Sequence, residues 1–166
     1  MADGKDGKIE VIQINIPKDS NIIFGQSHFI KTAEDIAEIV ISAVPGIEYG
    51  LAFCEASGPC LIRTEGNSEE LIKAASETAG QLGVGHSFVL FIRKAFPINI
   101  LNAIKNCQEV AGIFAATANP LQIVIYKTSQ GSGVLGVIDG FSPKGIETSE
   151  DKKSRKEMLR KFGYKF

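Results

Sequence analysis

The sequence has few of the residues on which common metal and redox sites depend. Its 166 residues include only two histidines, too few for a three-histidine zinc site. The three cysteines, Cys54, Cys60 and Cys107, match no zinc-binding spacing. We interpret them as reduced, mostly buried thiols of a cytoplasmic protein. A Cys54–Cys60 disulfide across a hairpin is the less favoured alternative. We expect no metal site built from protein ligands alone.

Long apolar segments and strong net charge are also missing. No apolar run approaches the roughly 18 residues that mark a membrane-spanning helix. The polar, glycine-containing residues 1–8 do not resemble a signal peptide. The net charge of −1 gives no electrostatic argument for nucleic-acid binding. We therefore expect neither a membrane nor a nucleic acid among the partners.

Several motifs of nucleotide-binding and hydrolytic enzymes are absent. The chain has no P-loop, no G-x-S-x-G and no H-E-x-x-H. Residues 131–136 match G-x-G-x-x-G, but a strand is predicted after this match where a dinucleotide-binding unit has a helix. Gly131 and Gly133 nevertheless lie in a turn of small residues that can expose backbone N–H groups to an anion. An ordinary hairpin turn explains them equally well.

The strongest structural signal is the apolar run at residues 88–92, which is too short for a helix and rich in strand formers. We predict a strand that is buried on both faces at the centre of a sheet. Gly83 and Gly85 end the preceding helix and leave room for close approach. His86 then stands at the mouth of the central strand, with Arg93 at its other end.

Strands and helices alternate along the rest of the chain, which predicts a layered α/β single domain with a mixed β-sheet and about three helices. Residues 1–148 form the domain, and residues 149–166 form a charged tail with seven Lys/Arg against three Asp/Glu. We expect the tail to be a short solvated helix rather than a nucleic-acid-binding arm. The predicted elements are strands at 8–16, 22–24, 49–55, 60–63, 88–92, 113–116, 121–126 and 134–138, and helices from Thr32, from Asn67 or Ser68 to Leu82, and over 96–106.

Both histidines lie in settings that suit phosphate. His28 precedes by four residues a helix whose N-terminus favours anions, and Lys31 is nearby in sequence. His86 has glycine neighbours and a rigid strand. An imidazole is a competent nucleophile toward phosphorus. A structural role is the alternative for either histidine, and for His86 it is the more common one for a residue at a strand end.

Six blocks of the sequence together resemble the adenosine-specific kinase family, an ancient prokaryotic and largely archaeal family of compact single domains. They are GQSHFIKTAED at 25–35, PGIEYGLAFCEASG at 45–58, GVGH at 83–86, FPINILNAIK at 96–105, ATANP at 116–120 and QGSGVLGVIDG at 130–140. The resemblance covers about residues 8–147, so the basic tail looks like an extension of the family pattern.

The resemblance implies adenosine or AMP binding, a stably phosphorylated histidine and an oligomeric assembly. It makes His28 and His86 site candidates, and it also places five further residues near the site: Lys31, Asn99, Asn102, Asn119 and Asp139. Each of these has an ordinary structural alternative, such as capping a helix or shaping a turn. In the site, Lys31 or Arg93 would neutralise phosphate, and Asp139 would act as a base or a Mg²⁺ ligand.

The leading hypothesis is an adenosine-directed phosphotransferase that uses ATP or another phosphoryl donor, with Mg²⁺ as a candidate cofactor. The alternatives are a non-catalytic adenine-nucleotide sensor and a purely structural oligomer subunit. We expect a homo-oligomer, either a trimer or a multiple of it, because the chain carries more apolar residues than one domain of this size must bury. The two histidines meet if the strand ending near Phe24 lies beside the strand that begins at His86 and runs antiparallel to it. His86 would then bear the phosphate, with His28 beside it.

Overall fold

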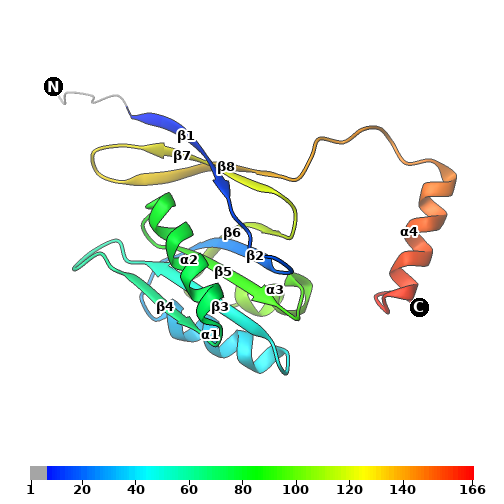
Figure 1. Ribbon diagram of the computed structural model, residues 1–166, viewed down its shortest axis with the longest axis horizontal. Helices are drawn as coiled ribbons and strands as arrows, with labels where there is room; N and C mark the ends of the chain where they lie inside the picture. The colour runs from blue at the N-terminus through cyan, green and yellow to red at the C-terminus, as the bar shows by residue number, and fades with distance from the viewer. Residues whose placement is uncertain (1–6) are drawn as a thin grey trace.

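A five-stranded sheet, with strand order β4-β3-β5-β2-β6, forms the centre of the computed structural model, which describes residues 7–166 (Figure 1). Its strands are β2 (Asn21–Ser27), β3 (Glu48–Cys54), β4 (Ile62–Gly66), β5 (Ser87–Arg93) and β6 (Val110–Thr117). The predicted strand at 88–92 is β5, which is the middle strand and is fully buried from Phe88 to Ile92. The sequence predicts that residues 1–8 are not a signal peptide, and most of this segment lies outside the described residues.

The two faces of the central sheet are covered by different layers. Phe88, Leu90 and Ile92 of β5 pack with α1 (Thr32–Ala43) and α3 (Pro97–Lys105). Val89 and Phe91 point to the opposite face, where they pack with α2 (Glu69–Leu82) and with a second sheet. This alternation, with apolar residues on both faces, explains why the sequence of β5 is continuously apolar.

The second sheet has three strands, in the order β1-β7-β8: β1 (Lys8–Ile14), β7 (Leu121–Lys127) and β8 (Ser132–Asp139). Ile14, Leu121, Ile123 and Ile125 of this sheet contribute to the core beneath it. Figure 1 shows the three-stranded sheet lying over α2 and the central sheet.

All named strand pairings of the described residues are antiparallel. The α/β class is confirmed, but the expected single mixed sheet is corrected to two antiparallel sheets. The sole parallel pairing in residues 7–166 is one isolated bridge, between Val84 and Ser132. The chain forms two sheets because the segment after β6 turns away and pairs with β1 instead of extending the central sheet.

Four helices occur in the described residues; the fourth, α4 (Ser149–Lys161), is the predicted tail helix. Its start is fixed by a capping box, in which the Thr148 hydroxyl accepts from Asp151 N–H and the Asp151 carboxylate accepts from Thr148 N–H. Each helix described in residues 7–166 is too short or too polar to span a lipid bilayer. The boundary proposed at residue 148 stays a prediction.

Three local predictions need correction. The second strand continues past Gly25 to Ser27. The Thr32 side chain forms no capping box, because its hydroxyl donates to Phe29 C=O. Ser68 is the N-cap residue of α2, but its side chain makes no capping hydrogen bond. The Asn67 side chain accepts from Tyr49 N–H at 2.9 Å and donates to Ile47 C=O at 2.8 Å.

Candidate functional site

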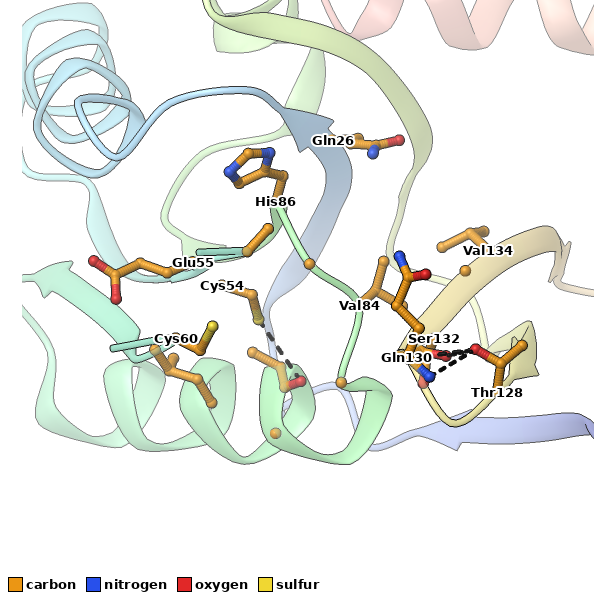
Figure 2. Close-up of a pocket in the computed structure, with 18 of the residues that line it drawn as sticks. Gln26, Cys54, Glu55, Cys60, Val84, His86, Thr128, Gln130, Ser132 and Val134 are labelled. Atoms are coloured by element: carbon orange, nitrogen blue, oxygen red, sulfur yellow. Dashed lines mark hydrogen bonds between the residues drawn. The ribbon is translucent and has the colours of Figure 1, made fainter. Parts of the chain in front are cut away.

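A cavity of about 950 Å³ opens where the segment between α2 and β5 meets the turn between β7 and β8. Figure 2 shows His86, Gln26 and Ser132 around this cavity, with Cys54 and Glu55 beside it. Three of the predicted site residues line it together: His86, Gly131 and Gly133. These residues come from two segments that are far apart in the sequence, so only the folded chain brings them together.

The backbone of His86 is held in place from two sides. Its N–H donates to Cys54 C=O at 2.8 Å, and its C=O accepts from Ser27 N–H at 2.8 Å. These bonds join it to the ends of β3 and β2, the two neighbours of β5. Its φ of 59° lies in the left-handed region, which non-glycine residues adopt infrequently. Such conformations persist only where the surrounding structure enforces them, and they are common at functional sites.

The side chain of His86 is half-buried and stacks on Phe53, with ring centroids 5.9 Å apart and an interplanar angle of 17°. Gly85, immediately before it, passes very close to the β3–β4 connection, because a Cβ there would lie 2.9 Å from Ala56 Cβ. The predicted need for glycine beside His86 is therefore explained by packing against Ala56. The imidazole is fixed by an aromatic face and by a backbone with little freedom.

The opposite wall of the cavity is the turn between β7 and β8, which the Thr128 side chain organises. Its hydroxyl accepts from Gln130 N–H at 3.2 Å and donates to Gly131 C=O at 3.1 Å. Val84 forms a bridge with Ser132, so this turn is joined to the chain two residues before His86. The hairpin-turn interpretation is thus confirmed for Gly131, whereas Gly133 belongs to β8, where it pairs with Tyr126; both glycines line the cavity.

The charged and thiol groups of the cavity have clear environments. The pKa of Glu55 is lowered, first by the hydrogen bond from Leu61 N–H at 2.8 Å and also by Arg63 at 2.8 Å. This carboxylate is therefore ionised near neutral pH. Burial raises the pKa of the Cys54 thiol, which stays protonated. All three cysteines are free; Cys54 is buried, whereas Cys107 is half-buried and Cys60 is exposed.

His28 lies in different surroundings. Strands β2 and β5 pair antiparallel, with Gln26 opposite Ser87, so the backbones of the two histidine segments are adjacent. The His28 side chain is exposed and stacks on Phe29, and it is not among the residues that line the cavity. Its phosphoryl-transfer role stays a prediction.

Lys31 is engaged in ion pairs. Its ammonium contacts Asp35, and it lies 3.2 Å from a carboxylate oxygen of Glu109, which is only 3% exposed. Hydrogen bonds to Asp35 and then Glu109 raise the pKa of Lys31. The Cys107 thiol donates to Glu109 at 2.8 Å and is the largest cause that lowers the pKa of Glu109 to about 2. The Lys31 charge is therefore already balanced.

The remaining candidates lie away from His86. Asp139, at the far end of β8 from the cavity, accepts from Thr117 at 2.8 Å and from Asn119 at 3.1 Å. Asn99 accepts from Phe96 N–H at 2.9 Å at the start of α3. Asn102 is exposed on the same helix. Asp139 and Asn119 come together, but none of these four lines the cavity.

Sequence reasoning missed most of the polar residues that line the cavity, among them Gln26, Glu55 and Ser132. Gln26 lies beyond the strand that the sequence predicts at 22–24, whereas β2 continues to Ser27. Ser132 lies between the two glycines already selected, so its position was the available signal. Glu55 follows β3 directly, and the sequence does not indicate that the end of this strand lies next to His86.

Comparison with known proteins agrees with the resemblance seen in the sequence. The family model described as adenosine specific kinase matches residues 12–165. The match includes α4, which corrects the expectation that the basic tail extends beyond the family pattern. No curated protein matches the chain.

The crystal structure of PH1918 protein from Pyrococcus horikoshii OT3 is similar in both sequence and fold. The two chains are 44% identical, and the alignment covers 96% of this chain and 99% of that chain with a TM-score of 0.92. With a family match over nearly its whole length, the chain belongs to the adenosine-specific kinase family.

Proposed function

We propose that the protein transfers a phosphoryl group from ATP, or a donor of the same class, to adenosine and forms AMP. One observation carries the proposal most directly: His86 lies in a large cavity, held by hydrogen bonds on both sides of its backbone and by the ring of Phe53. A nucleophile with a fixed orientation loses little entropy on reaching the reactive geometry. The family match supports adenosine as the acceptor.

In the proposed reaction, a nitrogen of His86 attacks the terminal phosphorus of the donor. A P–N bond forms, the P–O bond to the leaving nucleoside diphosphate breaks, and the diphosphate departs with the bonding electrons. The 5′-hydroxyl oxygen of adenosine then attacks the same phosphorus. The P–N bond breaks, His86 is restored, and the hydroxyl proton is released to water. In each of the two displacements, the bond that forms to phosphorus replaces one that breaks, so the His86 imidazole is unchanged at the end of the reaction.

Mg²⁺ would neutralise charge on the donor phosphates, which is its usual role in phosphoryl transfer. Glu55 is the one carboxylate among the described residues that line the cavity, and it is ionised. Mg²⁺ commonly binds one or two carboxylates together with phosphate oxygens. Both oxygens of Glu55 already accept hydrogen bonds, one from Leu61 N–H and the other from Arg63, so the described lining of the cavity offers no free carboxylate for the ion. Asp139, proposed from the sequence as a base or metal ligand, lies outside the cavity lining and has no step here.

The test compares His86→Ala with wild type and with His28→Ala as the matched variant. Each protein is incubated with ATP and adenosine, and AMP is measured by chromatography. Loss of AMP formation in His86→Ala, at least 100-fold, supports the assignment. Phosphopeptide mass spectrometry under alkaline handling, which preserves P–N bonds, should find phosphate on the His86 peptide. Phosphate on the His28 peptide, or equal turnover in all three proteins, would contradict it.

A second candidate function is adenine-nucleotide sensing without turnover. It is favoured by the charge of the cavity: no Lys or Arg is among the described residues that line it. Phosphoryl transfer usually requires positive charge around the phosphates. Calorimetric binding of AMP together with no conversion of ATP and adenosine would support the sensor and refute the kinase.

A further inference from the structure

Two cysteines lie close to the two ends of the β3–β4 connection, defined here as residues 55–61. Cys54 is the last residue of β3, and Cys60 lies inside the connection. Both are free thiols, and both line the cavity. In Figure 2 they lie on the same side of the cavity, across from the turn between β7 and β8. The third cysteine, Cys107, is not among the residues that line it.

The pairing of β3 with β4 places the two thiols near each other. Cys54 pairs with Ile62, and Glu55 N–H donates to Leu61 C=O at 3.0 Å, which puts Cys60 diagonally opposite Cys54. Diagonal neighbours have Cα atoms about 7–8 Å apart, with the Cβ atoms closer. A disulfide requires Cα atoms about 4.4–6.8 Å apart, so the connection must shift by about 1–2 Å to form one.

The connection is built to move more easily than the strands that it joins. Residues 56–61 are all exposed. Gly58 lies in open space, because a Cβ there would meet no atom within 4 Å. Cys60 has a φ of 52°, in the left-handed region that non-glycine residues adopt infrequently. Segments with few buried contacts rearrange at low cost, so a shift of the connection costs little core packing.

A shift of the connection would be transmitted directly to His86. The Cys54 C=O accepts from His86 N–H at 2.8 Å. Ala56, two residues further along, packs so closely on Gly85 that a Cβ at Gly85 would lie 2.9 Å from the Ala56 Cβ. The connection therefore contacts both His86 and the residue immediately before it.

We propose that Cys54 and Cys60 are a redox-modification site, which a low-molecular-weight disulfide such as glutathione disulfide oxidises reversibly to an intramolecular disulfide. The bond draws the connection toward the end of β3, displaces Gly85 and His86, and so weakens nucleotide binding; this regulatory role rests on the proposed function. Disulfides that form in reducing compartments are usually transient and redox-sensing, as this one is.

The oxidation proceeds by two thiol–disulfide exchanges. The exposed Cys60 thiol loses its proton and attacks one sulfur of the external disulfide, whose S–S bond breaks; the first external thiol leaves with that proton. Burial raises the pKa of the Cys54 thiol, so Cys54 acts second. It loses its proton and attacks the Cys60 sulfur of the mixed disulfide, and the second external thiol leaves with that proton. Two cysteine thiols are oxidised, and one external disulfide is reduced to two thiols.

The first experiment asks whether the bond forms. Wild type, Cys60→Ser and Cys107→Ser are incubated with glutathione disulfide and mapped by mass spectrometry without reduction. Cys107→Ser is the matched control, since its hydroxyl also donates to Glu109 in place of the thiol. Wild type and Cys107→Ser should lose two hydrogen atoms and yield linked Cys54 and Cys60 peptides. Retention of both thiols, a link to Cys107 or a link between chains would overturn the proposal.

The second experiment follows the His86 amide and needs no nucleotide. Hydrogen exchange of the peptide that contains His86 is compared before and after oxidation. Exchange should become roughly tenfold faster in wild type and Cys107→Ser, because the bond to Cys54 C=O weakens. Cys60→Ser, which changes an exposed residue, should not respond to the oxidant. Equal exchange in the oxidised and reduced wild type would show that the disulfide does not reach His86 and would refute the regulatory role.

The third experiment measures regulation of the site. The oxidised wild type should bind ATP at least about fivefold more weakly by calorimetry, and dithiothreitol should restore the affinity. Cys60→Ser should bind ATP equally with and without the oxidant. Equal affinity of oxidised and reduced wild type would refute the regulation. The proposed function fails separately if wild type forms no AMP or if His86→Ala still forms it, and neither result alters the outcome of peptide mapping or hydrogen exchange.

Discussion

Replacement of Gly50 by alanine tests how α2 is placed over the central sheet. Gly50 lies in β3, directly beneath the start of α2. A Cβ at this position would lie 2.1 Å from the carbonyl carbon of Leu71 and 2.2 Å from the backbone nitrogen of Ile72. Ordinary carbon contacts are about 3.5–4.0 Å, so the helix backbone would have to withdraw by more than 1 Å.

The expected cost is about 3 kcal/mol, the upper part of the range for overpacked cores, because backbone atoms cannot rotate away as side chains do. For a chain of this length, that corresponds to a melting temperature lowered by about 6–12 °C. Urea denaturation followed by circular dichroism measures the free energy of unfolding directly. Because α2 delivers the chain to His86, AMP formation should fall as well.

Gly80→Ala is the matched control, and its expected effect has the opposite sign. Gly80 is inside α2, and a Cβ there would meet Ile62 Cδ1 at 3.6 Å, an ordinary contact. Alanine in a helix interior is more stable than glycine by about 0.5–1 kcal/mol. If Gly50→Ala unfolds within about 0.5 kcal/mol of wild type, or if the two variants shift in the same direction, the described packing of α2 on β3 is wrong.

Two further predictions concern polar contacts outside the cavity. The pKa of Glu109 is lowered to about 2, chiefly by the Cys107 thiol. The ionised Glu109 therefore stabilises the folded state fully above its ordinary pKa of 4.5, and this stabilisation is lost as the pH falls toward 2. Glu109→Gln should make the free energy of unfolding less dependent on pH in this acid range, and an unchanged pH dependence would contradict the prediction. Asn67→Ala removes hydrogen bonds to Tyr49 N–H and Ile47 C=O and should cost about 1–2 kcal/mol in urea denaturation, whereas a cost below about 0.5 kcal/mol would contradict the contacts.

Local patterns in the sequence were sufficient for most elements. The apolar run at 88–92 predicts a buried central strand because only a strand with both faces covered needs apolar residues at consecutive positions. The Pro45–Gly46 pair marks the end of α1, which the structure places at Ala43. The position of His86 at the mouth of β5 also followed from the sequence and is confirmed. The antiparallel pairing of β2 with β5, which the sequence allowed but did not require, is what the structure shows.

The division into two sheets was not visible in the sequence. Strands β6 and β7 are both short and apolar, and only three residues separate them. No feature of the sequence near β7 indicates that it pairs with β1, which lies more than 100 residues earlier in the chain. Strand pairing depends on which edges remain free after the rest of the chain has folded, so this choice belongs to the tertiary structure.

The candidate site shows the same division. The sequence determined that His86 and the Gly131–Gly133 turn have unusual local composition, because glycine and histidine have their own backbone and chemical properties. Only the tertiary structure decided that Ser132 bridges to Val84 and closes a cavity there. It likewise placed Lys31 between Asp35 and Glu109, since a buried carboxylate requires a charged partner that no sequence spacing specifies.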